Sequence, residues 1–271
     1  MSRGIVAVTS LAFEARIALG AGVSVICSQG PQLAAAIKSA IKGGSSGIIS
    51  FGVAGGLAPG LVEGQLIAAA AVRTEQELFP TDRAWTRSLL ERLPGAVHAD
   101  IFGADAAVAY PSEKRLLHAQ TGAAAVDMES HIAARIAAAY RVPFAACRVI
   151  IDAVDRLLPP AALVGLRPNG TADIAAVFRS ILQKPGQLPA LVRIARDARI
   201  ASSALRRGQR LLGAGLGFPQ FGDDTPDVGA SDRKEANVGA FNQNRGWVRQ
   251  AAGPETRSVR ALVAQTDICG H

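Results

Sequence analysis

The sequence predicts an α/β fold in which helices cover both faces of a central, mainly parallel β-sheet. Hydrophobic residues make up 49% of the 271 residues and aromatic residues only 5%. That balance is typical of buried strands packed beneath helices. Short apolar runs with strand character also alternate along the chain with amphipathic, helix-like stretches. The length suffices for one large domain or two small ones with a substantial core.

The first part of the chain reads as three strands separated by two helices. Each strand is a short apolar run, and each helix repeats apolar residues three or four positions apart. Gly30 precedes the second helix, and glycine is common in the turns between a strand and a helix. In order, the segments are a strand at 4–9, a helix at 13–18, a strand at 24–27, a helix at 31–41, and a strand at 47–51 that runs into a glycine-rich turn at 51–57.

The second part contains the clearest helix and a long apolar strand. The helix has Ile132, Ala133, Ile136 and Tyr140 along one stripe. Proline pairs and a Pro-Asn-Gly sequence then predict an irregular connection. In order, the segments are a strand at 123–126, a helix at 128–140, a strand at 143–152, an irregular stretch at 156–171, a helix at 172–182, and one or two helices at 188–212.

Positive charge is concentrated near the end of this pattern. The net charge is +7, and seven of the 29 Lys and Arg residues lie within 184–213 beside a single Asp. Because the preceding residues are close to neutral, we do not expect the chain to bind nucleic acid. On a helical wheel, the apolar residues of 188–212 share one side and six arginines share the other.

Three regions follow from these shifts in composition. Residues 1–183 are predicted to form a catalytic domain and 184–215 a basic amphipathic helical extension. Residues 216–271 are rich in Gly, Pro, Asp and Asn and lack apolar periodicity, which predicts a poorly ordered tail.

Cysteine usage and apolar run length predict a cytoplasmic location. Cys27, Cys147 and Cys269 are scattered, which matches neither a disulfide framework nor a metal cluster. No apolar run approaches the roughly 20 residues of a membrane span. The first residues lead directly into a strand without a signal-peptide pattern.

Two acidic residues are candidates for a functional site because of their positions in the predicted elements. Glu129 lies in line with the apolar stripe of the helix at 128–140, so its carboxylate needs a partner. It either binds a ligand, caps that helix, or pairs with Arg148. Asp152 ends a strand on the same face as Arg148 and Ile150, at the edge where open α/β sheets bind ligands. Its alternative role is to cap the following turn.

The order and spacing of three motifs resemble one superfamily. They are Gly52-Val53-Ala54-Gly55-Gly56-Leu57, Val126-Asp127-Met128-Glu129 and Arg148-Val149-Ile150-Ile151-Asp152. Over residues 4–183 the chain resembles the purine nucleoside phosphorylases and the methylthioadenosine/adenosylhomocysteine nucleosidases. Within them it looks closest to the hopanoid-associated phosphorylases, through stretches such as Gly103-Ala104-Asp105 and Leu158-Pro159-Pro160.

That resemblance implies a three-layer phosphorylase/hydrolase-like fold with a central twisted mixed β-sheet flanked by helices. It also implies an enzyme that cleaves the N-glycosidic bond of an adenine nucleoside, without a metal or organic cofactor. The substrate would be adenosylhopane, with a small methylthioadenosine-type nucleoside as the close alternative. A nucleoside-binding protein that has lost turnover is the alternative from another class. A homo-oligomer is implied as well.

The resemblance assigns roles residue by residue. Asp152 matches the acid that protonates purine N7, and Glu14 matches a carboxylate that activates water. For substrate binding, Glu129 and Met128 match residues that hold the ribose, while Ala54, Gly55 and Val108 match the lining of the base pocket. Ile151 departs from a frequent Ser, and Ala107 departs from an aromatic residue, which suggests a roomier pocket.

The nucleophile is left open between water and inorganic phosphate, the second as a co-substrate. Glu14 favours water, because a carboxylate repels phosphate. Arg16 and Gly30 are the candidates for a phosphate cradle. A basic helix such as 188–212 can also lie on the inner, anionic face of a membrane, which would suit a lipid-linked substrate. The alternative is that its apolar side packs on the domain and leaves the arginines in water.

Overall fold

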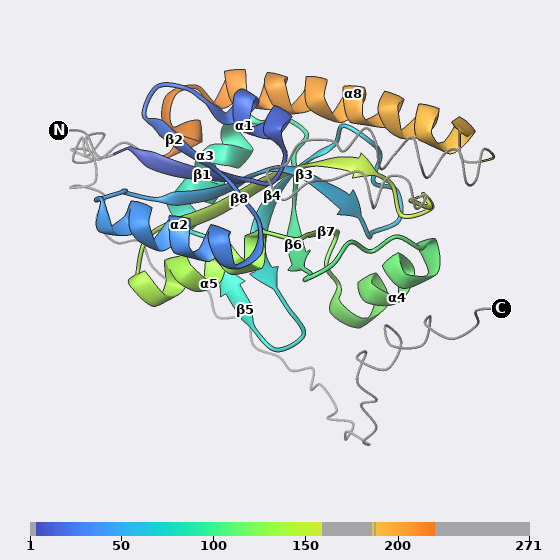
Figure 1. Cartoon of the computed structure of the whole chain (residues 1–271), viewed down its shortest axis with the longest axis horizontal. Coiled ribbons are helices and arrows are strands. Elements are labelled where there is room, and N and C mark those ends of the chain that lie inside the picture. Colours follow the sequence, from blue (N-terminus) through green and yellow to red (C-terminus); the bar gives the residue numbers. More distant parts are fainter. Residues whose placement is uncertain (1–3, 159–185, 187, 220–271) are drawn as a thin grey trace, which may run out of the picture. The chain divides into compact units, whose positions relative to one another are not determined.

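The computed structural model describes residues 4–158, 186 and 188–219. They form a three-layer α/β fold with an eight-stranded mixed sheet between two layers of helices (Figure 1). The predicted helix at 172–182, most of the irregular stretch at 156–171 and nearly all of the predicted tail lie outside the described residues. Among the described helices, none has the length and apolar character needed to cross a membrane.

The strands and helices follow the predicted alternation and add several elements to it. The strands are β1 (Ile5–Thr9), β2 (Val23–Cys27), β3 (Ile48–Gly56), β4 (Leu66–Arg73), β5 (Leu78–Pro80), β6 (Val97–Gly103), β7 (Ala125–Asp127) and β8 (Phe144–Asp152). The helices are α1 (Ala12–Ala18), α2 (Gly30–Lys42), α3 (Arg83–Arg92), α4 (Pro111–Thr121), α5 (Ser130–Tyr140) and α8 (Leu188–Leu212). A short 3-10 helix, η2 (Ala214–Gly217), follows α8.

Part of the sheet closes on itself. The strand order is β2-β1-β3-β7-β6-β4-β5, and β8 pairs with both β3 and β4. The strands β3, β7, β6, β4 and β8 therefore form a closed ring. β8 runs parallel to β3 and antiparallel to β4. The sheet is thus mixed, whereas strand and helix alternation alone favoured a mainly parallel one.

Each face of the sheet has its own hydrophobic core. On one face α1, α3 and α8 bury residues such as Ile17, Trp85 and Leu205. On the other, α2 and α5 bury residues such as Leu33 and Ile136, and the two helix layers are visible in Figure 1. Burial of these side chains stabilises the domain by about 1.5–3 kcal/mol for each large aliphatic residue.

The basic helix α8 is an integral part of this core. Its Ala201, Leu205 and Leu212 are buried against the sheet face that also carries α1 and α3. Ala195, placed on the apolar side of the wheel, is exposed instead. Phe218, within the predicted tail, packs edge-on against Trp85 with ring centroids 4.7 Å apart. Residues up to 219 therefore continue the compact domain.

One predicted turn is a strand. The glycine-rich stretch 51–57 was expected to turn after a strand ending at Phe51, but β3 continues through it to Gly56. Glycine does not prevent extended backbone, and here the strand pairs with β8 from Ile48 to Gly55. This extension brings the glycines between the two strands that carry the acidic motifs.

Candidate active site

Arg148 is the centre of a buried charge cluster. It lies on β8 and is fully buried. Its Nη2 is 2.6 Å from Asp127 Oδ2 and 3.5 Å from Glu129 Oε2, and it donates to Ser50 Oγ over 2.5 Å. Its Nη1 donates to the carbonyl of Val53. An arginine can be buried in this way only because acids and acceptors surround it.

Glu129 pairs with Arg148 and does not cap the helix that follows it. It occupies the N-cap position of α5 without a capping hydrogen bond, and Asp127 accepts the backbone N–H of Ser130 in its place. Burial raises the pKa of Glu129 to about 8, with Asp127 and Glu14 adding repulsion against the opposing pull of Arg148. A carboxyl with this pKa is partly protonated near neutral pH.

Glu14 joins the same cluster from α1. It is completely buried and accepts backbone N–H groups from Ser10 at 3.0 Å, Leu11 at 2.8 Å and Val53 at 2.7 Å. Burial raises the pKa of Glu14, while Arg148 and these hydrogen bonds oppose the rise. Glu14 therefore caps its own helix and also links α1 to β3.

Gly52 permits this close approach. A Cβ at Gly52 would lie 2.4 Å from Glu14 Oε1 and 2.7 Å from Arg148 Nη1. Such distances are too short for any side chain to be accommodated without moving the charged groups. The glycine in the first predicted motif is therefore required by packing between two buried charges.

Asp152 ends β8 and pairs with a lysine. It is largely buried, and its Oδ2 accepts a hydrogen bond from Lys114 Nζ on α4. Burial raises the pKa of Asp152, and Lys114 opposes the rise. The register slips here: Ile150 pairs with Ala54, but Asp152 pairs with Gly55. Ile151 is thus an extra residue, and the simple alternation predicted from Arg148 to Asp152 is interrupted by this irregularity.

Gly55 connects the two acidic motifs. In β3 it pairs with Val126 of β7 on one side and with Asp152 of β8 on the other. A Cβ at Gly55 would lie 3.5 Å from both carboxylate oxygens of Asp152. Two strand spacings, about 10 Å, therefore separate the backbone of Val126 from that of Asp152. Glu129 follows three residues after Val126.

The other predicted substrate-binding residues lie around these strands. Ala54 is buried in β3 and Met128 is partly buried directly before Glu129. Val108, in the connection between β6 and α4, is partly buried and packs against a small apolar cluster that includes Val126. These residues are positioned by the elements that carry Gly55 and the acids.

The two candidates for a phosphate cradle are not part of the charge cluster. Arg16 is exposed, and with Arg206 and Arg210 of α8 it lines a surface hollow. Glu14 is buried two residues earlier on the same short helix. Gly30 begins α2 with a φ of 55°, and a Cβ there would meet nothing within 4 Å. The arrangement brings Glu14, Glu129 and Arg148 together and leaves Arg16 outside.

Lys114 and Asp127 are site residues that the sequence patterns did not reveal. Asp127 belongs to a quoted motif, and two acids this close, one at the end of a short buried strand and one just beyond it, could have signalled a buried cation. Lys114 carries no such signal, because its helix α4 has charged residues on several sides and neighbouring Arg115 is exposed.

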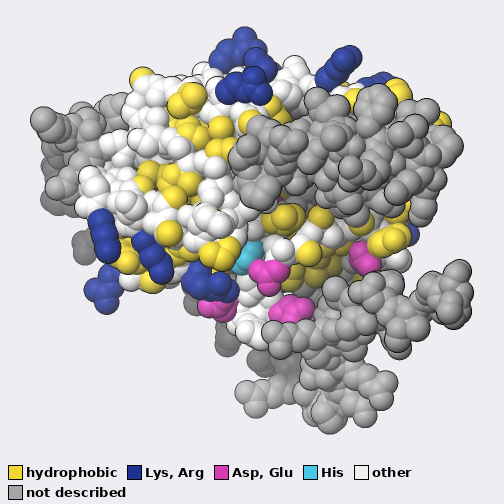
Figure 2. All heavy atoms as spheres, viewed as in Figure 1, with side chains coloured by type: hydrophobic (Ala, Val, Ile, Leu, Met, Phe, Trp, Pro, Cys, Tyr) yellow, Lys and Arg dark blue, Asp and Glu magenta, His cyan; other side chains and the backbone are white. Residues whose placement is uncertain are grey.

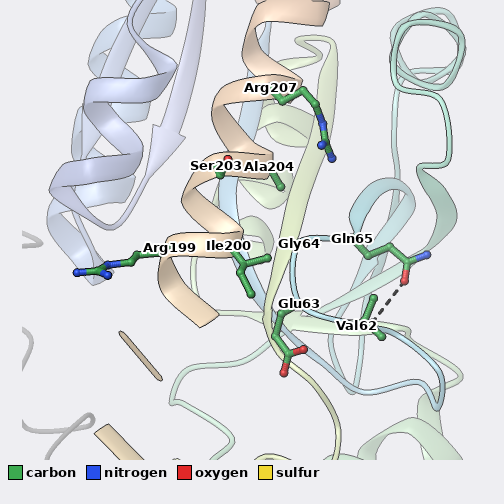
Figure 3. Close-up of a pocket in the computed structure, with 9 residues that line it drawn as sticks. All are labelled: Val62, Glu63, Gly64, Gln65, Arg199, Ile200, Ser203, Ala204 and Arg207. Carbon is green, nitrogen blue, oxygen red and sulfur yellow. Dashed lines mark hydrogen bonds between the residues drawn. The ribbon is translucent and has the colours of Figure 1, made fainter. Parts of the chain in front are cut away.

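A separate hollow of about 670 Å³ lies between the β3–β4 connection and α8 (Figure 3). Arg199 and Arg207 point in different directions from its α8 side, and Glu63 points away from the helix. None of the predicted site residues lines it. Within the described part of the chain, no group of three or more His, Cys, Asp and Glu side chains is arranged to hold a metal ion.

Comparisons with known proteins identify the family of the chain and solved structures with a similar fold. A family model described as the phosphorylase superfamily matches residues 15–183. No curated protein matches the sequence. Futalosine hydrolase of Helicobacter pylori has 17% identity and a TM-score of 0.53, covering 68% of this chain and 99% of its own. A Helicobacter pylori MTAN mutant with 5′-methylthioadenosine in its active site has 16% identity and a TM-score of 0.53, covering 76% and 98%. An S-adenosylhomocysteine nucleosidase from Streptococcus pyogenes has 14% identity and a TM-score of 0.52, covering 76% and 98%. At these identities the likeness is one of fold.

Proposed function

The chain belongs to the phosphorylase superfamily, and from that premise we propose that it cleaves the N-glycosidic bond of an adenine nucleoside. The observation that carries the proposal is the register at Gly55, which pairs with Val126 on one side and Asp152 on the other. The strand ends that lead to Glu129 and to Asp152 are thereby about two strand spacings apart, and this spacing is the support for a nucleoside bound between the two acids. Asp152 would bind the purine, and Glu129 with Met128 would hold the ribose.

The proposed chemistry relies on two ends of one substrate. Cleavage passes through a sugar with developing positive charge, which an ionised Glu14 would stabilise while Glu129 would bind the ribose hydroxyls. At the other end, the departing purine must gain a proton, most favourably at N7, from Asp152. Ala54, Gly55 and Val108 would line the base pocket. No cofactor enters this reaction.

Water is the proposed nucleophile. Glu14, Asp127 and Glu129 surround one cation, Arg148, so the cluster is more acidic than basic when its carboxyls are ionised. A phosphate anion would be repelled there. Glu14 is proposed to accept the proton of water, and its raised pKa brings the base closer to the operating pH. Arg16 and Gly30 would serve phosphate only in the alternative, phosphorolytic reaction.

The first prediction is release of adenine without phosphate. Purified protein incubated with 5′-methylthioadenosine, adenosylhomocysteine or adenosylhopane is expected to release free adenine, measured by chromatography. The rate should be unchanged when phosphate is removed. A rate that depends on phosphate would establish phosphorolysis instead. No adenine from any of the three would favour a nucleoside-binding protein without turnover.

The finer proposal is that the nucleoside is adenosylhopane. Ala107 is exposed and Val108 only partly buried, so the connection between β6 and α4 presents small side chains beside the proposed site. A turnover ratio in favour of adenosylhopane supports this choice, and a ratio in favour of 5′-methylthioadenosine supports the small-nucleoside alternative. The homo-oligomer remains a prediction.

A lipid-linked substrate would bring the protein to an anionic membrane face, and α8 is the proposed contact. The apolar side of α8 is occupied by the core, so the contact would be electrostatic. Six arginines of α8 are exposed, and Figure 2 shows Lys and Arg side chains along the edge that α8 occupies in Figure 1. They are Arg193, Arg196, Arg199, Arg206, Arg207 and Arg210.

The second prediction tests this contact. Replacing Arg193, Arg196 and Arg199 together by Gln should weaken binding to phosphatidylserine-containing liposomes roughly 100-fold, at about 1 kcal/mol for each charge. Sedimentation with liposomes at low salt measures the effect. The control variant replaces two exposed lysines of α2, Lys38 and Lys42, by Gln on the other side of the sheet. It should bind the liposomes as tightly as wild type does. Equal binding by the arginine variant would exclude α8 as the contact.

A further inference from the structure

Lys114 is a fully buried lysine whose ammonium group has three acceptors. Besides Asp152, its Nζ donates to the backbone carbonyls of Ala153 at 3.2 Å and Arg156 at 3.3 Å. An ammonium group has three N–H donors, so all of them are used. Burying this charge would be costly without these partners. Lys114 therefore holds both the acid at the end of β8 and the turn that follows it.

Lys114 contacts one of the two carboxylate oxygens of Asp152. Lys114 engages Oδ2, while a Cβ at Gly55 would lie in ordinary contact with both oxygens. The absence of a side chain at Gly55 thus keeps open the surface over which the carboxylate lies. Among the described residues, Lys114 is the one side-chain donor to Asp152.

Two other acids lie near the pair, and one arginine partly compensates their charge. Glu63 and Asp197 face Asp152 closely enough to repel its negative charge. Arg156 lies between them, with its Nε 3.1 Å from Glu63 Oε1 and 3.3 Å from Asp197 Oδ2. Lys114 is therefore the cation that acts directly on Asp152.

We propose that Lys114 is the positioning residue for Asp152 and the source of the proton that Asp152 passes to the leaving base. This inference rests on the proposed function. As the C1′–N9 bond breaks, its electron pair moves into the purine, and N7 takes a proton through the Asp152 carboxylate. That proton leaves the Lys114 ammonium, which becomes a neutral amine, so Asp152 is ionised before and after the transfer. Water adds to C1′ and gives its proton to Glu14, and solvent returns Glu14 and Lys114 to their starting states.

The step predicts a specific response to pH. With Lys114 present, the ammonium still supplies the transferred proton at a pH where Asp152 is ionised. Without Lys114, the buried Asp152 has a higher pKa, because the opposing cation is gone. It can then act only in its own protonated form. Activity lost at alkaline pH should therefore return as the pH falls.

The experiment uses the full chain with Lys114→Met, Lys114→Arg and a matched control. Arg115→Met removes the neighbouring cation of α4, which is exposed and pairs with Asp155 in the same turn. The substrates are the adenine nucleoside that wild type cleaves and 4-nitrophenyl ribofuranoside, whose leaving group needs no proton. Lys114→Gln, which is uncharged but keeps two N–H donors, replaces Lys114→Met if thermal melting shows that variant unfolded.

We expect Lys114→Met to lower kcat for the nucleoside about 100-fold at pH 9, within the usual range for a positioned acid. KM should change little, most of the loss should disappear by pH 6, and Lys114→Arg should retain part of the activity. The nitrophenyl substrate and Arg115→Met should behave as wild type does.

Equal losses on both substrates at every pH would reduce Lys114 to a structural role and overturn the proposal. So would full activity of Lys114→Met at pH 9. A wild-type protein that releases no adenine, in contrast, contradicts the proposed function itself. That result is obtained without any Lys114 variant.

Discussion

Asp152→Asn is expected to lower kcat for adenine release by about 10²–10⁴-fold, the usual contribution of a positioned acid. An amide of the same shape keeps the contact with Gly55 but cannot transfer a proton to the purine. The measurement is steady-state kinetics with an adenine nucleoside. KM should change less than kcat, because the loss occurs mainly in the transition state.

A control at Asp155 distinguishes the loss of proton transfer from the loss of a negative charge. Asp155 is exposed and pairs with Arg115, so Asp155→Asn should leave kcat within about threefold of wild type, as expected for a surface pair. Asp152→Asn should also retain cleavage of 4-nitrophenyl ribofuranoside. An unchanged rate of adenine release by Asp152→Asn would remove Asp152 from the role of acid.

Arg148→Met is expected to lower the free energy of unfolding by about 3–5 kcal/mol, because removing one partner of a buried ion pair leaves uncompensated charge. Asp127 and Glu129 would lose their cation inside the domain. Denaturant unfolding at pH 7 measures the change. The matched control, Arg135→Met, breaks a partly exposed pair with Glu77. It should lower the free energy of unfolding by about 1 kcal/mol or less.

The loss in Arg148→Met should depend on pH in a defined direction. Arg148 lowers the pKa values of Glu14 and Glu129, which burial already raises, so its removal raises them further. A carboxyl whose pKa is higher in the folded than in the unfolded protein binds more protons when folded. The free energy of unfolding of the variant therefore falls as the pH rises from the ordinary glutamate pKa of 4.5 to the raised pKa of the folded variant. A deficit as large at pH 5 as at pH 8 would mean that lost packing, rather than charge, is responsible.

The acidic residues of the candidate site could be singled out from the sequence because they lie in motifs. Glu129 follows a short strand and is costly to bury, and Asp152 ends a strand, so both could be singled out before the fold was known. Pairing with Arg148 was one of the three roles left open for Glu129, and the ion pair confirms that role. The fold class was also confirmed, since alternating strands and helices leave few ways to bury their apolar sides.

Lys114 and the register of β8 could not be predicted in this way. Lys114 and Arg115 are adjacent basic residues on one helix, yet one is fully buried and the other exposed. Helical periodicity does not say which of them will meet an acid 38 positions later. The extra residue at Ile151 likewise follows from pairing with β3. Both outcomes depend on contacts between distant segments, which local patterns do not encode.

The closed ring of strands has a consequence for how the protein is made. Its last member in chain order, β8, pairs along β3 and also with β4. Until β8 has emerged from the ribosome, the backbone groups of β3 and β4 that bond to it have no strand partner. Non-local pairing of this kind slows folding and exposes strands to association with other chains. Nascent chains truncated before β8 should therefore be the ones that chaperones retain.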